Sequence, residues 1–94
     1  MIMDVKEYIT KGLLTAMKDS GIKINPNIVL KKSNIYGDIY TPIALGIAKE
    51  LKSNPYSLAL KIMSHFPWDQ KFVTPDPSLE KTITGPGFIN FYLV

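Results

Sequence analysis

The chain lacks several kinds of residue, and each absence removes a class of function. It contains no cysteine in 94 residues, so disulfide bonds and thiolate chemistry are excluded, which agrees with a cytoplasmic location. It has a single histidine, His65, and eight scattered acidic residues, so no metal site is expected. No apolar run approaches the roughly 20 residues of a membrane span, and the N-terminus lacks the apolar region of a secretory signal. We therefore expect a cytoplasmic protein without membrane or metal partners.

Arginine is also absent, because all eleven basic residues are lysines, and the formal net charge is only +3. Lysine neutralises a phosphate as a point charge, but it cannot form the flat bidentate fork to a guanine edge or a phosphate. If RNA binds, the attraction to its backbone should be weak and salt-sensitive, and side-chain amides and rings would have to read the bases. The alternative is that these lysines form an ordinary solvated surface.

No arrangement typical of catalysis is present. No serine stands in a Gly-x-Ser-x-Gly setting. The Gly85-Pro86-Gly87 segment precedes an expected strand, whereas a phosphate-binding loop must open a helix. We place His65 at a helix end, interacting with the helix dipole. The chain by itself is therefore expected to have no catalytic residues and to hold no cofactor.

Hydrophobic residues make up 46% of the chain, enough for one small globular domain over residues 1–94. Helix-start signals and apolar periodicity predict three helices. The first, over 4–20, opens with a capping box at Asp4 and stops near Gly21. The second, over 42–52, opens at Thr41-Pro42, and the third, over 55–66, lies between Asn54-Pro55 and Pro67.

Short β-branched and aromatic runs predict the strands. They lie at 28–30, on one side or the other of Gly37-Asp38, briefly at 72–73, at 79–84 and after Gly87. The expected fold is α+β, with two layers in the order α-β-β-α-β-β, an antiparallel sheet, and helices packed on one face. The sheet's other face should be partly open to solvent. The expected core consists of Ile9, Leu13, Met17, Ile47, Leu51, Leu58, Ile62, Ile89 and Phe91.

The last strand sorts its side chains with a period of two. Ile89, Phe91 and Leu93 should face the core, and Phe88, Asn90 and Tyr92 should face the other way. Rings stack on unpaired bases, and an amide both donates and accepts hydrogen bonds, so this second set suits RNA. The alternative is that the rings are ordinary half-exposed sheet residues.

The same segment carries a family resemblance. Gly-Pro-Gly-Phe-Ile-Asn-Phe at 85–91, preceded by Gly37-Asp38 and by a helix with Ile43-Ala44-Leu45 and Ala48-Lys49, resembles the N-terminal additional domain of arginyl-tRNA synthetase. The resemblance spans nearly the whole chain. It implies a module that docks on the elbow of tRNA and touches the D loop. It also implies a parent enzyme that joins arginine to tRNA using ATP, so both of these ligands would belong to the parent's catalytic domain.

The resemblance also bears on single residues. Phe88 and Asn90 match the motif, whereas Tyr92 enters only through the alternation along the strand. The family commonly has an aromatic residue after Gly-Asp; here Ile39 takes that place and Tyr40 stands next to it, which makes Tyr40 a fourth candidate. Gly37-Asp38 is expected to shape the turn before the second helix.

Other interpretations remain open. The synthetase signatures of the His-Ile-Gly-His and Lys-Met-Ser-Lys-Ser types are absent, so the chain is expected to be either an excised N-terminal domain or a free-standing relative. The runner-up function is a protein-interaction module of the same fold, docking on a partner or on the parent's catalytic domain, since Tyr and Phe are also enriched at protein interfaces.

Overall fold

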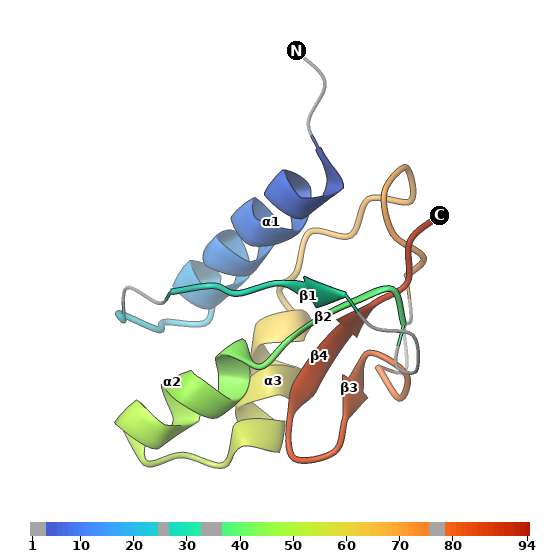
Figure 1. Ribbon diagram of the computed structural model, residues 1–94. Coiled ribbons are helices and arrows are strands. Elements are labelled where there is room, and N and C mark those ends of the chain that lie inside the picture. Colours follow the sequence, from blue (N-terminus) through green and yellow to red (C-terminus); the bar gives the residue numbers. More distant parts are fainter. Residues whose placement is uncertain (1–3, 25–26, 33–36, 76–78) are drawn as a thin grey trace.

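Within residues 4–24, 27–32, 37–75 and 79–94, which the computed structural model describes, three helices accompany a four-stranded antiparallel sheet (Figure 1). The strand order is β1-β2-β4-β3, so the last strand lies inside the sheet. This confirms the α+β class. The elements are α1 (Val5–Asp19), β1 (Lys31–Lys32), β2 (Ile39–Thr41), α2 (Ile43–Leu51), α3 (Pro55–Met63), β3 (Ile83–Thr84) and β4 (Phe88–Phe91).

Both ends of α1 and the start of α3 follow the predicted signals. Asp4 caps α1, because its carboxylate accepts a hydrogen bond from the Lys6 amide at 2.8 Å. The helix ends at Asp19 with Ser20 as its C-cap, and Gly21 follows with φ +79°. Asn54 caps α3 by accepting a hydrogen bond from the Ser57 amide at 2.9 Å.

Two boundaries of α2 differ from expectation. Pro42, not Thr41, is the N-cap, and the Thr41 hydroxyl instead accepts a hydrogen bond from the Ile43 amide at 3.3 Å. Leu51, which was expected in the core, is the last residue of the helix and is 47% exposed. The prediction for Leu51 was wrong because the chain turns away at Lys52, which adopts a left-handed conformation.

Helix α3 ends at Met63, three residues earlier than predicted. A residue that precedes proline disfavours the helical region, so Pro67 restricts Phe66 and the last turn loosens before it. His65 lies at this end, with its Nδ1 atom 3.0 Å from the Lys61 carbonyl oxygen. The expected place of His65 at a helix terminus is confirmed.

The strands are shorter than predicted. The run at 28–30 is not a strand, and the pairing falls on the exposed Lys31–Lys32 instead. Of the run at 79–84, only Ile83–Thr84 pairs with β4, because Leu79 has φ +60° and begins a turn. The brief strand expected near residue 73 is a single bridge between Val73 and Leu93.

The core lies between the helices and one face of the sheet. Helices α2 and α3 pack against that face, which carries Ile39, Ile89 and Phe91. Helix α1 packs against α3, and its place in the expected two-layer arrangement stays a prediction. Apart from Leu51, every expected core residue is buried. In the described residues, no helix is long and apolar enough to cross a membrane.

One tyrosine ties α1 to the segment after α3. The Tyr8 hydroxyl donates a hydrogen bond to the Pro67 carbonyl and accepts one from the Asp69 amide, both at 2.8 Å. Burial raises the pKa of the Tyr8 phenol; the Asp69 carboxylate raises it further, and the hydrogen bond from the Asp69 amide opposes both. The Tyr8 ring also stacks on Phe72, with 4.7 Å between the ring centroids.

Candidate nucleic-acid interface

The four predicted site residues share one face of the sheet. Tyr40 of β2 stands directly opposite Asn90 of β4, and residues opposite each other in an antiparallel pair project to the same side. Phe88 and Tyr92 lie two residues from Asn90 on either side and therefore share its face. The residues between them, Ile89 and Phe91, are in the core. We call Tyr40, Phe88, Asn90 and Tyr92 the ring face.

The three rings of this face are each partly exposed. Tyr40 and Phe88 touch edge to face, with ring centroids 6.0 Å apart and an angle of 76° between the planes. The Tyr92 hydroxyl lies 3.5 Å from the Lys81 carbonyl oxygen, at the far end of the face. The structure thus brings the candidate aromatic residues together, and their role in binding RNA stays a prediction.

Asn90 does not stand open to solvent as expected, because only 1% of its surface is exposed. Its amide nitrogen donates to the Thr84 hydroxyl at 2.8 Å, and lies 3.3 Å and 3.4 Å from the carbonyl oxygens of Thr82 and Lys81. The physical reason is that β3 is only two residues long, so the chain before it folds against Asn90 instead of extending the sheet. The alternation along the strand placed Asn90 on the correct face of the sheet, but it could not show that the segment before β3 covers this residue.

The oxygen end of the Asn90 amide has no partner among the residues that the structure describes. Its Oδ1 atom is buried and accepts no hydrogen bond from the described residues. Three oxygen acceptors surround the nitrogen, which fixes the orientation of the amide. An unpaired buried acceptor costs about 1–3 kcal/mol, so a ligand that supplied a donor here would recover that free energy.

The turn that opens β4 rests on α3. Gly85 and Gly87 have φ of +57° and +137°. A Cβ atom on Gly87 would lie 2.9 Å from the carbonyl carbon and oxygen of Pro55, so only glycine fits. This close approach fixes where Phe88, the first residue of the strand, leaves the turn.

Gly37 and Asp38 have a different role from the expected one. They lie before β2 rather than beside the second helix, and the Asp38 amide donates a hydrogen bond to the Phe91 carbonyl at 2.9 Å. Gly37 has φ +76°, and a Cβ atom there would lie 2.9 Å from the same carbonyl oxygen. The pair holds the C-terminal end of β4. The Gly-Asp motif marked this position in the sequence. It could not show which strand the pair contacts, because Phe91 lies more than fifty residues away.

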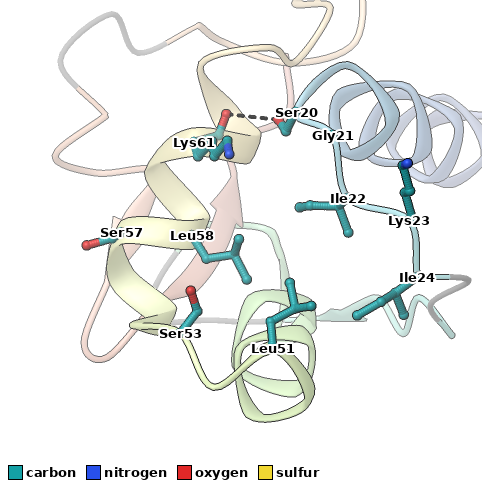
Figure 2. A pocket seen from close by; sticks show the side chains of 10 residues that line it. All are labelled: Ser20, Gly21, Ile22, Lys23, Ile24, Leu51, Ser53, Ser57, Leu58 and Lys61. Carbon is teal, nitrogen blue, oxygen red and sulfur yellow. Dashed lines mark hydrogen bonds between the residues drawn. The ribbon is translucent and has the colours of Figure 1, made fainter.

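A separate hollow of about 440 Å³ lies where the ends of α1 and α2 meet α3 (Figure 2). Ile22, Ile24, Leu51 and Leu58 give it apolar walls, and the Ser20 hydroxyl donates to the Lys61 carbonyl at 3.3 Å beside it. None of the ring-face residues lines this hollow. Among the residues with described positions, no group of three histidine, cysteine or acidic side chains is placed to hold a metal ion.

Comparison with known proteins places this chain. It matches the family described as "Arginyl tRNA synthetase N terminal domain" over residues 3–93. It is 37% identical over 91 residues to the arginine–tRNA ligase of Prosthecochloris aestuarii, covering 95% of this chain and 16% of that protein. It is 38% identical over 94 residues to the arginine–tRNA ligase of Thermotoga petrophila, covering 99% of this chain and 16% of that protein. The chain therefore spans about a sixth of the length of these relatives.

Solved structures agree in fold. The Thermus thermophilus arginyl-tRNA synthetase superposes with a TM-score of 0.67 at 21% identity, over 92% of this chain and 13% of that one. The Plasmodium falciparum arginyl-tRNA synthetase superposes with a TM-score of 0.69 at 18% identity, over 100% of this chain and 17% of that one. With the family match over 3–93, the chain belongs to the family of arginyl-tRNA synthetase N-terminal domains.

Proposed function

We propose that this domain binds tRNA through the ring face, docking on the elbow and contacting the D loop. In the parent enzyme, the catalytic domain would then ligate arginine to that tRNA with ATP. One observation carries the proposal: partly exposed rings gather on one sheet face around a buried amide whose oxygen has no partner among the described residues. Proteins that bind looped RNA stack unpaired bases on aromatic side chains and contact base edges with amides.

The rings supply the first contact. Tyr40 and Phe88 already touch, and Tyr92 follows directly after β4 on the same face, so stacking surface extends along the face. Each stacked base is worth about 1–3 kcal/mol and carries little sequence preference. Because Asn90 is buried, we expect a base amine to reach its oxygen only after neighbouring side chains shift. Asn90 then adds base selectivity to an affinity that the rings provide.

Lysines provide the charge at the border of the ring face. Lys31 is the register partner of Tyr40 and so lies on the same side of the sheet, where it is exposed. Lys32 follows it on the edge strand. As point charges they would attract phosphates without fixing a base, which predicts modest and salt-dependent affinity.

Removing a ring should weaken tRNA binding with little change in the fold. We expect Phe88→Leu and Tyr92→Leu each to reduce affinity for a tRNA transcript by about 5- to 150-fold, the loss of one stacked base. Tyr56→Leu is the matched control, because Tyr56 lies on α3 and is 40% exposed. Fluorescence titration measures affinity, and circular dichroism checks the fold. Equal affinity for wild type and both ring variants would contradict the ring face as the site.

Asn90→Ala is a less selective probe than these ring variants. The substitution also removes the hydrogen bonds from the amide nitrogen to the segment before β4, so we expect some loss of stability together with any loss of affinity.

The alternative function, a protein-interaction module, is favoured by the apolar hollow in Figure 2. Such a module would dock on a partner or on the catalytic domain of the parent enzyme. Chemical-shift mapping with a tRNA transcript at two salt concentrations separates the two functions. RNA binding should shift signals on the ring face and weaken steeply as salt rises. Affinity indifferent to salt, or no shifts on adding tRNA, would favour the protein module, whereas tRNA-induced shifts away from the last strand would show that the ring face is not the RNA site.

The isolated chain should not activate arginine. No synthetase signature and no catalytic constellation occurs in its sequence, so arginine-dependent pyrophosphate exchange is expected to stay at background. A full-length relative with its catalytic domain serves as the positive control. Exchange above background by this chain would indicate a free-standing enzyme instead.

A further inference from the structure

Asp38 bonds to both peptide groups that flank Tyr92. Its amide donates to the Phe91 carbonyl at 2.9 Å, and its carboxylate Oδ2 accepts from the Leu93 amide at 2.8 Å. The two bonds join the residue just before β2 to the segment at the end of β4, across 55 positions of sequence between Asp38 and Leu93. Tyr92 lies between the two anchored groups.

Tyr92 lies where the chain leaves its pairing with β2 and begins to contact the segment around Val73. The β2–β4 pairing ends with Ile39 opposite Phe91, so Tyr92 has no residue of β2 across from it. Past this point the Tyr92 carbonyl accepts a hydrogen bond from the Thr74 amide at 2.7 Å, and Leu93 bridges to Val73. The Asp38 carboxylate thus takes the place of a strand neighbour for the Leu93 amide.

Within the part of the chain that the structure describes, the Tyr92 side chain makes one weak polar contact. Its hydroxyl is 3.5 Å from the Lys81 carbonyl oxygen, the long limit of a hydrogen bond. The direction of the ring therefore depends mainly on the backbone that carries it. That backbone is fixed on one side by the Thr74 amide and on the other by Asp38.

We propose that Asp38 is a positioning residue for the RNA surface: its carboxylate holds the Phe91–Leu93 backbone so that the Tyr92 ring lies on the ring face. The part of this inference that concerns RNA rests on the proposed tRNA-binding function. The part that concerns the ring rests on the two hydrogen bonds alone.

Asp38→Ala and Asp38→Asn form a matched pair. Both substitutions remove the negative charge, and that removal by itself would favour binding to phosphates. Only asparagine keeps an oxygen that can accept a hydrogen bond from the Leu93 amide. We expect Asp38→Ala to bind a tRNA transcript about fivefold more weakly than Asp38→Asn, the lower end of a lost stack. In NMR spectra of the free chain, Asp38→Ala should move the Tyr92 ring and Leu93 amide signals, and Asp38→Asn should largely restore them.

A double-mutant cycle separates positioning from general destabilisation. In a Tyr92→Leu background, Asp38→Ala should change affinity by less than about twofold, whereas in a Phe88→Leu background its effect should persist. An equal loss in both backgrounds would overturn the proposal, since a merely structural role would weaken any site. Unmoved Tyr92 ring signals in Asp38→Ala would also overturn it. If the wild-type chain binds no tRNA, the proposed function and the RNA part of this inference fail together, and the ring signals still decide the positioning.

Discussion

Replacing Phe91 with alanine is expected to lower the free energy of unfolding by about 3–5 kcal/mol, through lost burial and the cavity left behind. Phe91 is 0% exposed and packs against the rings of Phe66 and Trp68, at centroid distances of 5.3 Å and 6.4 Å. A domain of this size has about 5–15 kcal/mol of stability in total, so this single change removes a large part of it. Urea unfolding followed by circular dichroism gives the difference.

Phe88→Ala is the matched control, because it makes the same change in the same strand on the partly exposed face. Its loss of stability should be clearly smaller. If Phe91→Ala does not fold, Phe91→Leu still tests the assignment, since it leaves a smaller cavity and should show a smaller loss. A loss below about 1 kcal/mol for Phe91→Ala would mean that its side chain does not lie in the core.

Replacing Gly87 with alanine is expected to be the most damaging of the glycine substitutions. The residue has φ +137°, and the new Cβ atom would meet the Pro55 backbone at 2.9 Å, where nothing can move aside as a flexible side chain would. The backbone strain alone costs about 1–3 kcal/mol, and the steric overlap adds to it. Thermal and urea unfolding measure the loss.

Substitutions at two other glycines separate the backbone strain from the steric overlap. Gly21 has φ +79° with open space around it, so Gly21→Ala should show the strain without the overlap. Gly46 lies within α2 with nothing near its missing side chain, so Gly46→Ala should stabilise the chain by about 0.5–1 kcal/mol. Equal effects at Gly87 and Gly21 would show that the turn does not press on α3.

The helices could be predicted well because their signals are local. The caps at Asp4 and Asn54 act on amides two or three residues away, and apolar spacing marks the buried side of a helix directly. The prediction for Leu51 failed because the burial of this residue depends on where the chain turns after the helix. β1 could not be predicted at all, since two exposed lysines become a strand only through pairing with β2.

The candidate site divides in the same way. Alternation placed Phe88, Asn90 and Tyr92 on one face, and the β2–β4 register adds Tyr40 to it. The burial of Asn90 depends on the segment before β3, which no local pattern describes. The contact of Asp38 with the Leu93 amide joins distant parts of the chain, so spacing in the sequence gives no hint of it.

The central position of the last strand has a consequence for how this domain is made. β4 is the pairing partner of both β2 and β3, so neither of those two strands can complete its hydrogen bonding until residues 88–91 have been synthesised. A nascent chain that has reached only Thr84 would present bare strand edges, which are prone to associate with other chains. The β1–β2 pair can form earlier, but the rest of the sheet should assemble late, after the segment that carries Phe88 and Tyr92 has emerged from the ribosome.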